Sequence, residues 1–274
     1  MEPRTIRFGL LRKLLLYIAL FLGAELVSML VFGAFFLASG HSESQNFFDA
    51  VIEYSETHST AVMLPVYGIV VAVLYIFNRL RGVSFLEKTA LNKKIDVKTA
   101  LLCVVMGFSA NFWMSLILNL IPLPQAWVQQ YSESAAALAT SNPIIDLLTI
   151  VLIAPLVEEI FFRGAMMNTM LKSTIVPIAI IGQGLIFGAI HGSPLWMIYA
   201  AVFGCILGYV RILTGSLWSV ILFHILFNAA PYAFTLFVGV AGDSIPLIYG
   251  TLLASAALFL GSLYVVYRRS DSAV

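Results

Sequence analysis

Three groups of residues, each containing ionisable or amide side chains, lie inside long apolar stretches of the sequence. They are Glu158, Glu159 and Arg163; Phe187 and His191; and His224 and Asn228. An ionisable side chain at the centre of a bilayer costs roughly 3 kcal/mol or more, so such residues are functional candidates by default. Carboxylates and imidazoles are also common general acids and bases. The three groups therefore predict a polar site that can transfer protons inside a membrane.

The spacing of the first group gives two neighbouring carboxylates different surroundings. Glu159 and Arg163 are four residues apart, hence about 40° apart around a helix, and can form an ion pair. Glu158 points about 100° away from Glu159 and is left without the arginine. In a poorly solvated site beside a like charge, Glu158 is the candidate base or acid. The same spacing also fits a buried triad that only holds helices together, so spacing alone leaves both interpretations open.

The two histidine groups repeat the four-residue spacing, which places each pair on one helix face. A lone membrane histidine is more often a packing residue than a catalytic one. His191 and His224 together with a carboxylate pair, in a chain with four histidines, favour a shared site. At about 1.5 Å of helix rise per residue, counted from the cytoplasmic face of the membrane, Glu158 lies roughly 20 Å deep and His224 roughly 12 Å deep. His191 lies roughly 26 Å deep on the same count. The helix of His191 must therefore start deeper, tilt or shift if the three residues meet.

The composition requires that these residues lie in a membrane protein. Of the 274 residues, 61% are hydrophobic and 11% are charged, whereas a soluble domain has about 25% charged residues. These values exclude a water-soluble fold, and they exclude disorder, which needs low hydrophobicity and high charge. The net charge of +1 offers no electrostatic footprint for nucleic acid, so no nucleic-acid partner is expected. Cys103 and Cys205 lie in apolar runs and indicate no disulfide framework.

Eight apolar stretches approach the roughly 20 residues that a helix needs to span a bilayer. They are residues 14–37, 61–78, 99–121, 144–171, 174–191, 196–212, 216–238 and 245–267. We therefore predict an all-α, polytopic integral membrane protein with about eight transmembrane helices. The first stretch exceeds the 7–15 apolar residues of a signal peptide, so it is predicted to be an anchor.

Basic residues are distributed unevenly between the two ends of these stretches. The 15 Lys and Arg residues lie at alternate ends of the eight predicted spans, which are the ends on one side of the membrane. The connections on the other side contain no Lys or Arg; they are about residues 39–60, 122–142, 192–195 and 239–245. The positive-inside rule then predicts that both termini are cytoplasmic. The basic connector from Arg79 to Lys98 is interpreted as an orientation signal that also attracts anionic lipid.

The chain is predicted to contain three regions: residues 1–121 as a structural wrapper of three membrane helices, residues 144–232 as the catalytic core, and residues 245–274 as a C-terminal transmembrane helix with a short basic tail. Within the core, small residues four apart predict close approach between helices. These residues are the pairs Gly188/Gly192 and Gly204/Gly208.

The three groups of residues match, in order and type, the motifs of a known family. Glu158-Glu159-x-x-x-Arg163, Phe187-x-x-x-His191 and His224-x-x-x-Asn228 resemble the motifs of the CPBP family. That family comprises CAAX prenyl proteases of the Ras-converting type and bacteriocin-processing enzymes, known in bacteria as the Abi group. The match covers residues 144–232, about a third of the chain. The resemblance implies an intramembrane endopeptidase that cleaves a membrane-associated or lipidated peptide or protein.

The resemblance also implies a role for each residue of the motifs. Glu158 would activate a water molecule, with His191 holding or sharing that water. His224 and Asn228 would stabilise the oxyanion of the tetrahedral intermediate. Structural support of the site would come from Glu159, Arg163 and Phe187. The expected partners are membrane lipid and a peptide or protein substrate, and the expected location is a prokaryotic plasma membrane.

Metal dependence is left open by these residue types. Glu158, His191 and His224 could supply a catalytic zinc set with one open position. Asn228 is a poor zinc ligand and fits the oxyanion role better, so no cofactor is favoured and zinc stays the alternative. The sequence has neither a His-Glu-x-x-His helix nor a paired-aspartate arrangement, which disfavours other intramembrane protease classes.

Two other functions compete with the protease prediction. A catalytically silent membrane scaffold, or a protein of the bacteriocin-immunity type, would use the same cavity only for binding. Loss of Glu158 would be its expected signature, and the intact motifs therefore argue against it. A proton-coupled transporter would typically show inverted repeats, and the sequence shows no repeat.

Overall fold

A computed structural model describes residues 3–40, 46–49, 51–52, 59–138, 142–242 and 244–271, and these residues contain helices and no strand. The long helices are α1 (Pro3–Ala38), α3 (Ser59–Leu80), α5 (Val97–Leu120), α11 (Pro194–Thr214), α12 (Leu217–Ala241) and α13 (Ile245–Asp271). Shorter helices are α4 (Phe85–Thr89), α6 (Gln125–Ala136) and α10 (Val176–Ala189). The prediction of an all-α polytopic membrane protein is confirmed.

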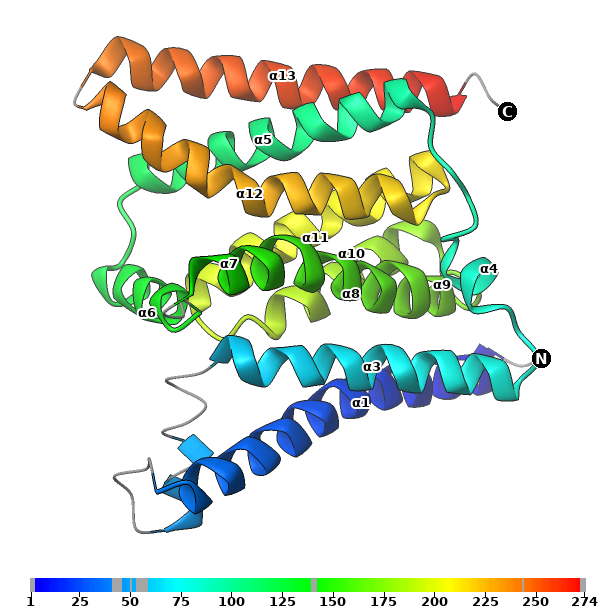
Figure 1. Ribbon diagram of the computed structural model, residues 1–274. Coiled ribbons are helices and arrows are strands. Elements are labelled where there is room, and N and C mark those ends of the chain that lie inside the picture. Colours follow the sequence, from blue (N-terminus) through cyan, green and yellow to red (C-terminus); the bar gives the residue numbers. More distant parts are fainter. Residues whose placement is uncertain are drawn as a thin grey trace.

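Within the described residues, six helices are long and apolar enough to cross a membrane. They correspond to six of the eight predicted spans. The predicted span 174–191 is the 14-residue helix α10, which is short for a complete crossing. The predicted span 144–171 is a run of short α and π segments. The count of eight spans and the cytoplasmic side of the termini stay predictions, although the start of α1 and the end of α13 lie at the same end of the bundle (Figure 1).

The helices form a layered bundle in which the predicted core occupies the middle (Figure 1). On one side of the core, α5 packs between α12 and α13, and on the other side α1 packs against α3. Helices α10 and α11 pack closely against each other next to the interrupted helix. Most of the predicted connection 39–60 and the last residues of the tail, 272–274, lie outside the described residues.

The interrupted helix consists of α7 (Pro143–Asp146), η1 (Leu147–Ile153), α8 (Ala154–Glu159), η2 (Ile160–Met166) and α9 (Met167–Met170). In η1 and η2 the backbone has π-helical geometry, so the N–H of Ala154 bonds to the carbonyl of Thr149 and the N–H of Met167 bonds to that of Phe162, each five residues back. π-turns are rare and frequently occur at functional sites. Glu158, the predicted catalytic carboxylate, and Glu159, predicted to support the site, end the α segment between these two π segments.

Close packing of α10 against α11 depends on glycine. A Cβ atom would come within 3.0 Å or less of a neighbouring helix at Gly188, Gly204 and Gly208, so the predicted close approach is confirmed at these positions. The prediction is wrong for Gly192, whose Cβ would meet no described atom within 4 Å. Gly192 has a φ of +78° in the turn after α10, and this left-handed conformation is what requires glycine there.

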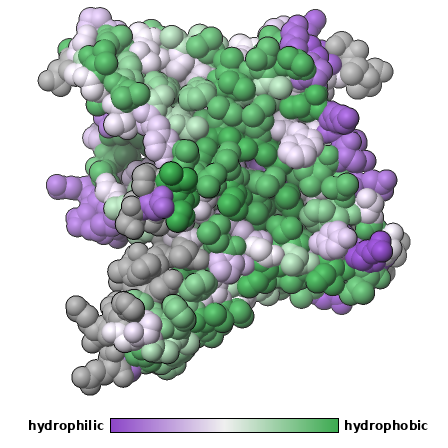
Figure 2. Space-filling model, viewed as in Figure 1, coloured by the Kyte–Doolittle hydropathy of each residue, from purple (hydrophilic) through white to green (hydrophobic). Residues whose placement is uncertain are grey.

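The surface separates into an apolar middle and polar ends. Hydrophobic side chains cover the central part of the visible face, and hydrophilic residues gather toward its two edges (Figure 2). A broad exposed apolar surface is the expected outer face of a membrane protein, whose helices contact lipid. On α3, for example, Tyr75 and Ile76 are exposed, whereas Tyr67 and Val70, on a different face of the helix, are buried.

Candidate active site

Glu159 and Arg163 form the predicted ion pair at the centre of the bundle. The Arg163 Nη1 atom donates to Glu159 Oε1 at 2.8 Å, and both side chains have an exposed fraction of 0%. Arg163 also donates through Nη2 to the backbone carbonyl of Gly204 at 3.0 Å, and its guanidinium lies 4.5 Å from the centre of the Phe187 ring. A Cβ on Gly204 would lie 3.1 Å from Nη2, so glycine makes room for the arginine.

His224 connects α12 to this ion pair. Its Nδ1 atom lies 2.8 Å from Glu159 Oε1, the same oxygen that accepts from Arg163. A carboxylate only accepts hydrogen bonds, so Nδ1 carries the hydrogen in this contact. The interaction fixes the ring with Nε2 directed toward the other carboxylate, at 3.8 Å from Glu158 Oε2. Glu159 therefore orients both Arg163 and His224.

Glu158 has a different set of neighbours, as its position around the helix predicts. Its Oε1 atom accepts a hydrogen bond of 3.2 Å from the hydroxyl of Tyr67 on α3, and its Oε2 atom faces His224. The residue is 9% exposed, whereas Glu159 is fully buried. Glu158 therefore keeps one carboxylate oxygen that a water molecule could approach.

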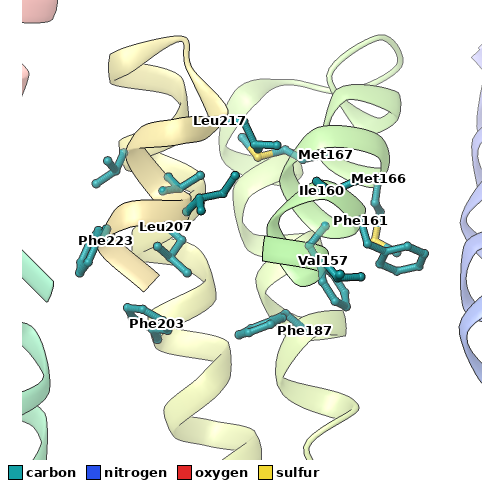
Figure 3. Packing of buried hydrophobic residues seen from close by; sticks show 14 of the residues in the cluster. Val157, Ile160, Phe161, Met166, Met167, Phe187, Phe203, Leu207, Leu217 and Phe223 are labelled. Atoms are coloured by element: carbon teal, nitrogen blue, oxygen red, sulfur yellow. The ribbon is translucent and has the colours of Figure 1, made fainter. Parts of the chain in front are cut away.

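His191 reaches the same region from the end of α10. Its Nδ1 atom lies 2.7 Å from the carbonyl oxygen of Phe187, and Nε2 takes no part in this contact. The Phe187 ring packs against both histidines, with ring centres 4.8 Å from His191 and 5.9 Å from His224. Phe203 of α11 also packs against His224, with ring centres 5.1 Å apart. Figure 3 shows Phe187 and Phe203 among the buried hydrophobic residues that pack together in the core.

The side chain of Asn228 binds the backbone of the interrupted helix. Its Nδ2 atom donates to the carbonyl of Ile150 in η1 at 2.9 Å. In the π-helical pattern this carbonyl would accept from the residue five positions later, which is Pro155, and proline has no N–H. Asn228 therefore satisfies a carbonyl that Pro155 leaves without its helical partner. The second N–H of the amide is not needed for this bond.

The structure adds two polar contacts that the sequence did not predict. Tyr67 lies in the region predicted to be a structural wrapper, and its hydroxyl contacts Glu158. Gln183 of α10 donates at 2.8 Å to the Gly204 carbonyl that Arg163 also uses. A tyrosine in an apolar stretch gives no signal by itself, since tyrosine is common there. Gln183 was the better clue, because it is the only amide in the predicted span 174–191.

Zinc is the alternative cofactor that the sequence leaves open. Among the described residues, no group of three or more His, Cys, Asp or Glu side chains is placed to hold a metal ion. Of the predicted ligands, His224 binds Glu159 through Nδ1, and Glu158 accepts a hydrogen bond from Tyr67 through one oxygen.

Fold and site together define a multi-pass α-helical membrane protein with a buried cluster of carboxylates, an arginine and imidazoles. Residues 140–230 match the family model described as Rce1-like, type II CAAX prenyl endopeptidase. The match covers about a third of the chain, and it confirms the resemblance to CAAX proteases predicted from the three motifs. No curated protein and no solved structure matched the chain.

Proposed function

We propose that the protein is an intramembrane endopeptidase that hydrolyses a peptide bond in a membrane-associated or lipidated peptide or protein. One observation carries the proposal: within the matched segment, Glu158 keeps an oxygen directed at His224, while Glu159 is engaged by Arg163 and His224. We further propose residues 144–232 as the catalytic core and a prokaryotic plasma membrane as the location.

In the proposed reaction, Glu158 acts first as a general base. A water molecule on Oε2 attacks the carbonyl carbon of the peptide, and Glu158 takes the proton that the water loses. The carbonyl oxygen becomes an oxyanion. Glu158 then gives its proton to the amide nitrogen as the C–N bond breaks, which releases a carboxylic acid and an amine. General acid and base catalysis of this kind contributes roughly 10²- to 10⁴-fold to the rate.

Hydrogen-bond donors for the oxyanion are proposed to come from α12. The orientation imposed by Glu159 directs His224 Nε2 to the position of the reacting water and carbonyl, where Nε2 donates in the doubly protonated ring. Asn228 would use the N–H of its amide that does not bind Ile150. Preorganised donors of this kind are each worth roughly 3 kcal/mol in the transition state. His191 would hold the attacking water through Nε2.

We propose that catalysis needs no metal. If zinc bound, the ligands would be Glu158, His191 and His224, which would require His191 and His224 to turn toward a common point. The purified enzyme should therefore keep its activity after treatment with a chelator and contain no stoichiometric zinc by elemental analysis. Activity that falls with the chelator and returns with added zinc would contradict this assignment.

The proposal is tested by comparing protein termini in membranes of the native host. Strains carry the wild type, Glu158→Gln or Glu133→Gln at matched abundance, and mass spectrometry identifies peptides and precursors of changed length. Glu133 lies on α6 and is exposed, so its substitution controls for loss of one carboxylate outside the site. We expect a precursor to accumulate only with Glu158→Gln.

A different result would favour a binding role. If no terminus changes with Glu158→Gln although deletion of the whole protein gives a phenotype, the protein acts as a scaffold. In that case the catalytic roles proposed for all the site residues would be wrong.

A further inference from the structure

We infer that Tyr67 is a positioning residue for Glu158, so that α3 completes the catalytic site from outside the segment that matches the protease family. The inference rests on the proposed function. Its basis is the hydrogen bond of 3.2 Å from the Tyr67 hydroxyl to Glu158 Oε1, which joins residues 91 positions apart in the sequence. No other described residue donates a hydrogen bond to that oxygen.

The phenol of Tyr67 is held rigidly toward the interrupted helix. Tyr67 is 1% exposed and lies on the buried face of α3, together with Val70 at 0% and Leu74 at 4%. A buried tyrosine hydroxyl needs a hydrogen-bond partner, and here the partner is the carboxylate assigned as the base. The other face of α3 is exposed, so the helix has one packed face and Tyr67 is its polar contact with the site.

The bond distinguishes the two oxygens of Glu158. Oε1 is occupied by Tyr67, which leaves Oε2 as the oxygen that faces His224 Nε2 at 3.8 Å. That separation is too long for a direct hydrogen bond but suits a water molecule bonded to both atoms. Without Tyr67 the carboxylate could rotate and lose this orientation. Tyr67 thus selects the oxygen that receives the proton from water.

The test compares Tyr67→Phe with the wild type on the substrate that the terminus comparison identifies, prepared as a synthetic peptide that spans the cleaved bond. The variant removes only the hydroxyl. Hydrogen bonds to charged groups are stronger than those between neutral groups, so loss of this bond should lower kcat roughly 10- to 100-fold. KM should stay within about twofold, because the hydroxyl contacts the base rather than the binding surface.

Tyr17→Phe is the matched control. Tyr17 of α1 also directs its hydroxyl at the interrupted helix, where it lies 3.0 Å from Thr169 Oγ1 and 3.4 Å from the carbonyl of Ala165. Its loss removes a comparable hydrogen bond between helices at a distance from Glu158. We expect Tyr17→Phe to lower the Tm while leaving kcat unchanged.

A second measurement tests the contact without any substrate. The decrease in Tm caused by Tyr67→Phe is measured in the wild type and in the Glu158→Ala background. If the hydroxyl bonds to Glu158, the decrease should be smaller when Glu158 is absent. Equal decreases in the two backgrounds would overturn the inference, even if no substrate has been found.

The outcomes separate this inference from the proposed function. If Glu158→Gln cleaves the peptide as fast as the wild type, the proposed function fails. If Glu158→Gln is inactive and Tyr67→Phe keeps a kcat within about twofold of wild type, only the positioning role fails. A loss of kcat with Tyr17→Phe as large as that with Tyr67→Phe would also overturn the positioning role, since it would show a general structural effect.

Discussion

Two adjacent carboxylates on one helix have different surroundings in this protein. Glu159 faces α12, is fully buried, and uses Oε1 to accept hydrogen bonds from Arg163 and His224. Glu158 faces α3, is slightly exposed, and contacts a neutral hydroxyl from Tyr67. The 100° turn between consecutive residues of a helix is what separates the two environments.

The difference shows how a helix can combine a fixed charge with a reactive one. The arginine compensates the charge of Glu159, and breaking such a buried pair is costly because it leaves one charge without its partner. Glu158 has no arginine partner, so its carboxylate can gain and lose a proton without breaking the ion pair between Glu159 and Arg163. We therefore expect substitutions at Glu158 to change activity and substitutions around Glu159 to change stability.

The largest effect is expected for Glu158→Gln, which keeps the side-chain shape and removes the base. The kcat should fall roughly 10³-fold, within the range of general base catalysis. The Tm should stay close to that of the wild type, because the amide can still accept from Tyr67. Both are measured on purified protein with the identified peptide. A large drop in Tm would contradict the comparison, since it would show that Glu158 is also structural.

The next effect concerns stability and is expected for Arg163→Met. Methionine approximates the volume of the arginine stem but leaves Glu159 buried without its cation. We expect a loss of about 3–5 kcal/mol in the free energy of unfolding, measured by denaturant titration in detergent micelles. The double variant Glu159→Gln/Arg163→Met should recover part of this loss because no buried charge remains. No recovery would mean that the packing of Arg163, rather than its charge, dominates.

The sequence predicted contacts within a helix better than contacts between helices. The Glu159–Arg163 ion pair followed from residues four apart, and the structure confirms it at 2.8 Å. The ends of the long helices also lie within a few residues of the predicted spans, apart from the N-terminus of α1, because the apolar stretches end at polar or turn residues. These features depend on local periodicity, which a single sequence contains.

Contacts between helices depended on packing that periodicity does not specify. The family resemblance implied an oxyanion role for His224, but nothing in the sequence predicted that Glu159 would bind its Nδ1 atom. Tyr67 was assigned to a wrapper, because nothing in an apolar stretch identifies the one residue that faces a site. The predicted depth of His191 conflicted with that of His224, yet ring contacts place both beside Phe187 at the end of the short helix α10.

A moderate effect is expected for Asn228→Ala. The substitution leaves the Ile150 carbonyl without its partner next to Pro155, so the free energy of unfolding should fall by about 1–3 kcal/mol. Asn119→Ala is the matched control, since Asn119 donates a 2.8 Å bond to the carbonyl of Ser115 from an exposed position. Equal losses for the two variants would argue against a special role for the π-helical carbonyl.

If Asn228 also donates to the oxyanion, Asn228→Ala should lower kcat by more than its effect on stability explains. The measurement is kcat at a temperature where the variant is fully folded. An unchanged kcat would restrict Asn228 to holding α12 against the interrupted helix.

The smallest effect is expected at an exposed ion pair, which tests how far burial explains the behaviour of Arg163. Asp96, before α5, accepts a hydrogen bond of 3.0 Å from Arg269 of α13, and both side chains are substantially exposed. Hydrogen bonds from the side chain and the backbone of Thr99, with Arg269 nearby, lower the pKa of Asp96 from 3.8 to about 2. The depressed pKa means that the ionised form stabilises the folded state. This contribution is complete above pH 3.8 and is lost as the pH falls toward 2.

Asp96→Asn should therefore lower the Tm slightly at neutral pH, and the difference from the wild type should disappear on acidification through this range. Arg269→Gln should have a still smaller effect, because Thr99 and the backbone N–H of Lys98 continue to bind Asp96. Exposed pairs usually contribute little, since water and salt screen the charges. If Arg269→Gln instead destabilised the protein as much as Arg163→Met, burial would not be the reason that the Glu159 pair is structural. The contrast between the two carboxylates of the site would then need another explanation.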